Sequence, residues 1–157
     1  MSAEDNKAVV RRFFEEVVNE GDLNTVDDIM ASHFVLHDPR YDDPCEGSPD
    51  DIKNAVEKIR TAFPDVRVNI EHQIADENDS VATRWTGTGA HEGEIDSIEP
   101  SHVQVEFHGM SFSHLSAGKI DETWNVMEDR LEVAELLKRL PPAFRCRMIC
   151  HICRRCC

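Results

Sequence analysis

The stretch from Gly118 to Asp129 carries the residue types best suited to chemistry, in an alternating order. One set of alternate positions holds Asp121, Thr123 and Asn125, and the other holds Glu122 and Trp124. A period of two is typical of a β-strand whose two faces meet different environments. Carboxylates, an amide and an indole on the last strand of a sheet could line a pocket, and a half-solvated sheet is the alternative.

The acidity of the chain restricts its partners. It has 31 acidic and 17 basic residues among 157, for a formal net charge of −14. Such a field repels nucleic acid and anionic membranes, so we expect neither as a partner. Only five of the basic residues are lysines. An acidic, lysine-poor surface is typical of a halophile's protein, because concentrated salt screens self-repulsion, and an ordinary acidic cytosolic protein is the alternative.

Length and hydropathy predict one domain in the cytoplasm. A chain of 157 residues, 40% of them hydrophobic, is long enough for one core. No apolar run approaches the roughly 20 residues of a membrane helix. The acidic first residues lack the basic start and apolar block of a secretion signal. We expect the domain at residues 1–140, followed by a tail at residues 141–157.

Helical periodicity comes first along the chain. Apolar residues at helical spacing predict buried faces in three helices, at about residues 4–20, 22–30 and 48–63. Gly21 ends the first helix, and Ser48 with Pro49 begins the third. A short extended piece follows the second helix and stops at Pro39.

From Val66 onward the period changes to two. Strands are predicted at about residues 66–74, 81–91, 102–115 and 120–127, joined as hairpins by turns at 76–79 and 117–118. Gly87 and Gly89 indicate a bulge or a close approach of the backbone. A short helix at 131–137 ends the pattern. Three helices followed by a curved antiparallel sheet define the α+β class.

Several short motifs occur in the order and spacing of the SnoaL-like polyketide cyclases, often called ester cyclases. They are Ala62 to Asp65, Gly89 to Gly93, Pro100, Gly118 to Ile120, and Glu122 with Trp124. The sequence resembles that family over roughly residues 5 to 138. The resemblance implies the nuclear transport factor 2-like fold, a cone in which a bent antiparallel sheet wraps round helices and encloses a pocket.

Characterised members of that family close a polyketide ring by intramolecular aldol condensation. The resemblance therefore implies a small hydrophobic carbonyl compound as substrate and acid/base chemistry that needs no cofactor and no metal. A carboxylate in an apolar pocket suits this chemistry, because desolvation makes it a better base. The family pattern places an aspartate just after the tryptophan of the last strand.

The sequence departs from the family at that aspartate, because Asn125 stands in its place. An amide cannot abstract a proton, but it can orient a carbonyl or donate to an oxyanion. Glu128, where relatives have a second aspartate, is either the replacement base or a cap of the final helix. Thr123 shares the face of Asn125, which makes it a substrate-binding candidate.

Histidines and aromatic residues complete the predicted site. His91 matches the Gly-x-His signature of the ester cyclases and is the acid/base candidate, or else a structural histidine. His37, near the expected pocket mouth, is a binding candidate. Ser111 and Gly109 align where characterised cyclases carry a histidine and a glutamine. Trp85 and Trp124 form either core or the pocket wall.

Two functional classes remain open from these residues. The first is a cofactor-independent cyclase or isomerase with His91 or Glu128 as base and Asn125 orienting the substrate. The second is a binding protein that has lost catalysis and retains the pocket, as the asparagine at position 125 suggests. In either case the resemblance implies a homodimer formed through the outer face of the sheet.

The tail contains five of the six cysteines, together with His151. Short Cys-x-x-Cys spacings resemble zinc ligands, but the tail lacks the spacer of a dozen or more residues between ligand pairs. We therefore expect a disordered appendage without a metal.

Overall fold

The computed structural model describes residues 2–39, 42–95 and 99–128 of the chain. Its helices are α1 (Ala3–Arg12), η1 (Phe13–Glu20), α2 (Asn24–Ile29) and α3 (Pro49–Ala62). Its strands are β1 (Met30–His37), β2 (Cys45–Gly47), β3 (Arg67–Ala75), β4 (Ser80–Ala90), β5 (Gln104–Ser116) and β6 (Lys119–Glu128). The predicted helix at 131–137 and the cysteine-rich tail lie outside the described residues.

Local signals in the sequence account for the helix ends. Ser2 begins α1 and Ser48 begins α3, each with a capping box in which an aspartate three residues later completes the reciprocal hydrogen bonds. The first predicted helix is continuous from α1 into η1, a π-helix that Gly21 ends in a left-handed conformation with φ 77°. No helix in the described part of the chain is long and apolar enough to cross a membrane.

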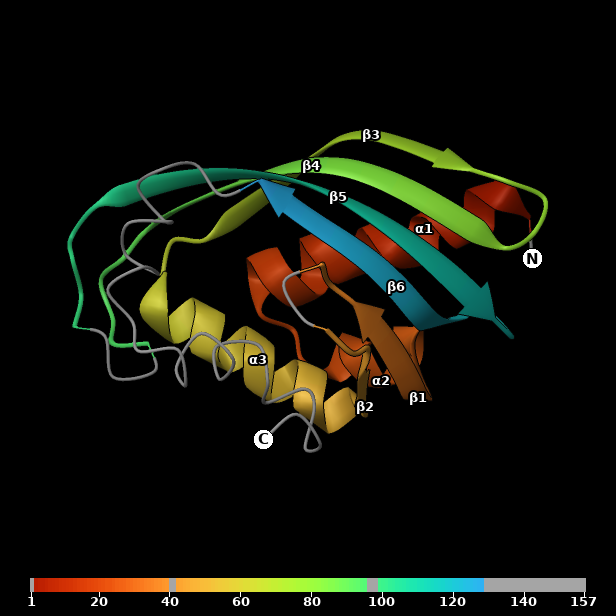
Figure 1. The fold of residues 1–157 in the computed structure, drawn as a ribbon, viewed down its shortest axis with the longest axis horizontal. Helices are drawn as coiled ribbons and strands as arrows, with labels where there is room; N and C mark the ends of the chain where they lie inside the picture. Colours follow the sequence, from red (N-terminus) through yellow and green to blue (C-terminus); the bar gives the residue numbers. More distant parts are fainter. Residues whose placement is uncertain (1, 40–41, 96–98, 129–157) are drawn as a thin grey trace.

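The strands form one sheet in the order β2-β1-β6-β5-β4-β3. Neighbouring strands are antiparallel except β1 and β6, which run parallel. The predicted α+β architecture is therefore present, with a mixed sheet in place of a purely antiparallel one. Figure 1 shows β3, β4 and β5 arching over α1, while α3 lies further from the sheet on the same side.

The sheet encloses the core on its concave side. Helix residues such as Val10, Phe14 and Val17 pack there against residues of the sheet such as Val81, Trp85 and Leu115. Removing apolar side chains from water is the main favourable contribution to this arrangement. The concave side is called the inner face below, and the convex side the outer face.

Both predicted hairpins are present, and two glycines on the inner face make room for aromatic rings. A Cβ atom built at Gly87 would lie 2.1 Å from the ring of Phe107, and one built at Gly109 would lie 2.2 Å from the ring of Trp85. Strand β4 pairs with β5 without a register shift, so Gly87 and Gly89 mark close approaches and no bulge. Register shifts lie between Ile70 and His72, between His114 and Leu115, and between Met30 and Val35.

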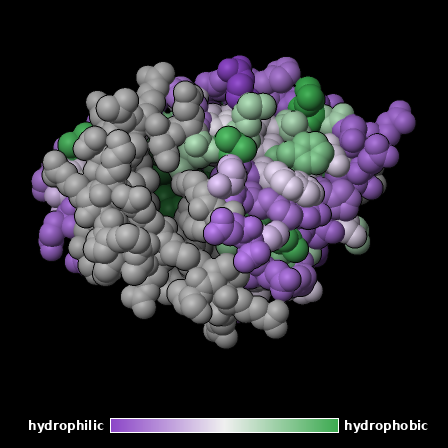
Figure 2. All heavy atoms as spheres, in the orientation of Figure 1, coloured by the Kyte–Doolittle hydropathy of each residue, from purple (hydrophilic) through white to green (hydrophobic). Residues whose placement is uncertain are grey.

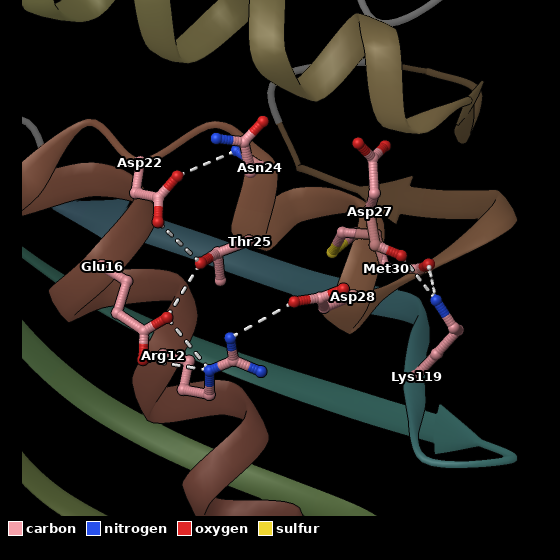
Figure 3. Close-up of polar contacts among 9 residues, drawn as sticks. All are labelled: Arg12, Glu16, Asp22, Asn24, Thr25, Asp27, Asp28, Met30 and Lys119. Atoms are coloured by element: carbon pink, nitrogen blue, oxygen red, sulfur yellow. Dashed lines mark hydrogen bonds and ion pairs between the residues drawn. The ribbon is translucent and has the colours of Figure 1, made fainter.

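Polar contacts join the helices to each other and to the β5–β6 turn (Figure 3). Arg12 donates to the Glu16 carboxylate at 3.0 Å, and Thr25 of α2 donates to the same carboxylate at 2.8 Å. The ammonium of Lys119 donates to the backbone carbonyl of Asp27 at 2.6 Å, where α2 ends. A cation at a helix C-terminus satisfies carbonyls that have no partner within the helix. The Gly118-Lys119-Ile120 motif therefore holds the scaffold together at this end.

Candidate functional site

One line of polar side chains crosses the inner face from β3 to β6. Register aligns Gln73 with Thr83, Thr83 with Ser111, and Ser111 with Asn125. Strand alternation puts all four on the same side as the buried residues of β4 and β5. Polar residues in line on an otherwise apolar concave surface are the arrangement expected of a small-molecule site.

Within this line, Trp85, Ser111 and Asn125 form a directed hydrogen-bond chain. The indole Nε1–H of Trp85 donates to Ser111 Oγ at 2.9 Å, and Ser111 Oγ donates to Asn125 Oδ1 at 2.8 Å. An indole is only a donor, so Ser111 must use its single proton toward the asparagine. Trp85 is 6% exposed and Ser111 is 8% exposed, which keeps water from competing for these groups.

This hydrogen-bond chain fixes the orientation of the Asn125 amide. Because Oδ1 accepts from Ser111, the amide nitrogen Nδ2 points its two hydrogens elsewhere, and Nδ2 has no hydrogen-bond partner among the described residues. A preorganised N–H donor can hold a carbonyl oxygen and stabilise the negative charge that develops there during enolate formation. Asn125 is thus oriented as a donor and has no capacity to act as a base.

Apolar and weakly polar groups surround this donor. Met127 follows Asn125 on the inner face of β6, and Phe107 packs edge-on against Trp85 with ring centroids 6.0 Å apart. On the other side, Thr123 Oγ1 donates to Ser113 Oγ at 3.2 Å. Gly109 has no side chain because Trp85 occupies the space beside it. Three predicted binding residues, Trp85, Ser111 and Thr123, therefore share one face with Asn125.

His91 lies at the far end of β4 from this cluster. The stretch from Thr83 to His91 corresponds to roughly 26 Å of strand at about 3.3 Å per residue. Its side chain is 0% exposed, and its ring lies 5.3 Å from the ring of Phe63. Nδ1 accepts from the backbone N–H of Ser101 at 3.1 Å. These contacts tie the end of β4 to the loop before β5 and to the end of α3.

The surroundings of His91 favour its neutral form. Burial lowers the pKa of the imidazole below its ordinary value, because a charged ring would lose its hydration. Since Nδ1 accepts a hydrogen bond, the proton of the neutral ring is on Nε2. That atom is buried and has no hydrogen-bond partner among the described residues. The catalytic role expected of His91 stays a prediction, and the structure does not bring it close to Asn125 along the strand.

His37 and Trp124 meet on the outer face. Their rings stack in parallel with centroids 4.6 Å apart, and His37 Nε2 lies 2.7 Å from a carboxylate oxygen of Glu122. Trp124 is 39% exposed. Alternation thus separates these two predicted binding residues from Thr123 and Asn125. Glu128 ends β6 opposite His108, and its side chain lies outside the described part of the structure.

Asp38, which follows β1, is a residue that the predicted site omitted. It is buried at 7% exposure, and β1 runs parallel to β6 with His37 opposite Trp124. The next positions along the two strands are Asp38 and Asn125. The available sequence signal was the alternation of Phe34, Leu36 and Asp38, but a parallel neighbour for this strand could not be foreseen.

An open groove of about 410 Å³ lies between α1, η1 and the edge strand β3, away from Asn125. Lys7, Arg11 and Gln73 are among its lining residues, and Arg11 donates to the Gln73 side chain at 3.1 Å. Across residues 2–39, 42–95 and 99–128, no three His, Cys, Asp or Glu side chains are grouped to hold a metal ion.

The architecture defines the class of protein first. A curved sheet that wraps helices on its concave side, with a polar cluster on that side, is the nuclear transport factor 2-like fold. Within that class, the family model of the SnoaL-like polyketide cyclases matches residues 8–135. The chain belongs to this family.

Solved structures of similar fold agree with this assignment. The chain is similar to a candidate polyketide cyclase from Acidithiobacillus ferrooxidans, with 28% identity, 90% of this chain and 100% of the other covered, and a TM-score of 0.72. It is also similar to AclR, a candidate hydroxylase from Streptomyces galilaeus, with 27% identity, coverage of 90% and 88%, and a TM-score of 0.72. A candidate SnoaL-like polyketide cyclase from Jannaschia, 21% identical with coverage of 88% and 95% and a TM-score of 0.73, shares the fold. Comparison with curated proteins finds no match.

Proposed function

We propose that the chain binds a small hydrophobic carbonyl compound on the inner face of the sheet and promotes its enolate chemistry, as in aldol cyclisation or isomerisation. The family supports a cyclase or isomerase type of function. The observation that carries the proposal is the hydrogen-bond chain from Trp85 through Ser111 to Asn125, which engages Asn125 Oδ1 and leaves the amide hydrogens without a partner among the described residues.

Asn125 has a defined part in this proposal. Its Nδ2–H groups hold the carbonyl oxygen and stabilise the enolate that forms when an α-proton leaves. Met127 and Phe107 supply apolar contacts to the rest of the ligand, and Ser111 keeps the amide from rotating. The proton acceptor is a separate group, for which the sequence offers His91 and Glu128.

A matched pair of ligands tests the carbonyl contact. We expect 1-tetralone to bind more tightly than tetralin, which is the same hydrocarbon frame without the oxygen. The isosteric change Asn125→Leu removes the donor and should weaken tetralone binding by roughly tenfold, the worth of one hydrogen bond, while tetralin binding stays unchanged. Titration followed by tryptophan fluorescence or calorimetry measures both.

Controls separate the donor from general packing. Val126→Leu, on the outer face of the same strand, should leave both affinities as they are. Equal loss of tetralone and tetralin binding in Asn125→Leu would mean that the residue contributes only packing contacts to the ligand. A wild type that binds neither compound would remove the proposal.

The second candidate function is a binding protein without catalysis, which the amide at position 125 favours. Under that reading, Asn125→Asp restores the family's carboxylate and should create aldol activity that the wild type lacks. Under the first reading, Asn125→Asp replaces the donor with a negative charge and should lower the activity of the wild type.

We also propose that the chain forms a homodimer through the outer face. Met110, Phe112, Trp124 and Val126 are exposed on neighbouring strands there, with Met110 at 59%. The acids beside them are paired, since His37 contacts Glu122 and His114 contacts Asp121, each at 2.7 Å. A second copy of this chain suits the patch, because an isologous contact sets the same exposed apolar side chains against each other.

A further inference from the structure

The parallel pairing of β1 with β6 places one carboxylate next to Asn125. Leu36 pairs with Thr123, and His37 pairs with Trp124. One step further along both strands brings Asp38 to the level of Asn125. Neighbouring strands lie about 4.8 Å apart, so side chains at the same level and on the same face lie within reach of one small ligand.

Alternation gives the direction of Asp38. Phe34 is buried and Leu36 packs against the core, while His37 stacks on Trp124 on the outer face. Asp38 comes next in this alternation and is 7% exposed, which agrees with an inward position. Asp38 and His91 continue the inner-face alternation of β1 and β4 and carry acid/base side chains, and His91 lies far along β4 from Asn125. Cys45, opposite Leu36, adds a buried thiol on the same face.

The geometry points to Asp38 as the general base of the reaction. This inference rests on the proposed function and adds the group that receives the proton. The family pattern places a carboxylate on β6 itself, and here β6 carries an amide while β1 supplies a carboxylate at the same level. The proton acceptor and the oxyanion donor are thereby divided between two neighbouring strands.

Protons and electrons balance in this reaction. The Asp38 carboxylate takes the α-proton of the ketone, and the C–H electron pair becomes the enolate, whose oxygen charge is held by Asn125 Nδ2. The enolate carbon then attacks a second carbonyl carbon of the same molecule, a C–C bond forms, and the π pair of that carbonyl moves to its oxygen. The Asp38 carboxylic acid returns its proton to that alkoxide, so no oxidant, reductant or other co-reactant is required.

Deuterium exchange isolates the proton transfer from ring closure. In D₂O the wild type should speed the exchange of the α-hydrogens at C2 of 1-tetralone, followed by NMR. Asp38→Asn should reduce the enzyme-dependent rate by about 100-fold or more, in keeping with the loss of a general base, while tetralone affinity changes less than about threefold. Asp38→Glu retains a carboxylate and should recover part of the rate.

Matched variants and a binding readout distinguish the outcomes. Asp43→Asn makes the same change in an exposed loop residue, and this variant should promote α-hydrogen exchange at the wild-type rate. Tetralin binding shows that each variant is folded. If Asp38→Asn binds tetralone and exchanges at the wild-type rate, the inference fails and the proposed function stands. If the wild type binds tetralone without exchange, Asp38 is not a base, and if the wild type binds no ketone, the proposed function fails as well.

Discussion

At the scale of single residues, the role of each polar group follows from what it can donate and accept. Trp85 can only donate, so Ser111 passes its proton to Asn125, and the asparagine is left with its amide hydrogens available. An aspartate in this position would have no such hydrogens. The same substitution that removes a base from β6 at this position therefore installs a donor, and the proton acceptor must be a different residue.

His91 gives a prediction about pH. Burial lowers the pKa of His91 in the folded chain, so below about pH 6.5 the unfolded chain takes up a proton that the folded chain refuses. The free energy of unfolding should thus fall as the pH drops from about 7 to 5. His91→Asn keeps an acceptor for the Ser101 N–H and removes the titrating ring, so it should lose less stability over this range.

Urea denaturation at several pH values measures this difference. His72→Asn, which changes an exposed histidine of β3, serves as the control and should follow the wild type. If His91→Asn shows the same pH dependence as the wild type, the buried ring does not contribute to it.

At the scale of elements, facing side chains on β4 and β5 are complementary in size. Gly109 lies directly opposite Trp85, and the ring of Trp85 fills the space that a side chain at position 109 would need. The ring is fixed in turn by Phe14, with centroids 6.1 Å apart, and by Phe107. The position of the indole donor, and through it that of Ser111, depends on this glycine.

Gly109→Ala should therefore be costly. Its Cβ would lie 2.2 Å from a ring atom of Trp85, so the ring must move, and overpacking of this kind costs roughly 1–3 kcal/mol of stability. Gly89→Ala is the matched control, because its nearest contact is 3.2 Å from a Phe63 side-chain atom and a smaller loss is expected. Thermal or urea denaturation gives both values. Equal losses in the two variants would mean that the contact with Trp85 is not limiting.

The sequence predicted the helices and strands better than it predicted how they pack against each other. Ser48, Pro49 and Gly21 act locally, and the helix ends that they predict are present. Alternation also grouped Thr123 with Asn125 correctly. It could not tell which face of β6 is concave, so Trp124 was expected in the core or at the pocket wall, whereas it is 39% exposed on the outer face. That choice depends on how the sheet curves, and the sheet curves through contacts between distant segments.

At the scale of the whole molecule, hydrophilic side chains cover much of the coloured surface on the face that Figure 2 shows, with apolar residues among them. The outer face is different, because Met110, Phe112, Trp124 and Val126 lie together on β5 and β6. Stable interfaces bury about 800 Å² on each partner. An apolar cluster of this kind on an acidic protein is a candidate centre for such an interface.

Light scattering coupled to size exclusion tests the dimer. The wild type should have twice the mass of the chain, and Phe112→Lys, which puts a charge into the centre of the patch, should weaken association by at least about tenfold. Val103→Lys changes another exposed apolar residue, outside the patch, and should remain dimeric. A monomeric wild type, or a dimer insensitive to Phe112→Lys, would assign the patch another role.

The pairing of β1 with β6 has a consequence for how the molecule comes into being. His37 and Trp124 are separated by roughly ninety residues of chain, so their contact closes one of the longest loops that the domain contains. During synthesis on the ribosome, Asp38 emerges long before Asn125, and the two become neighbours only when the closing strand has been released. Any fragment that ends before β6 would contain most of the scaffold but would lack Asn125, the proposed partner of Asp38.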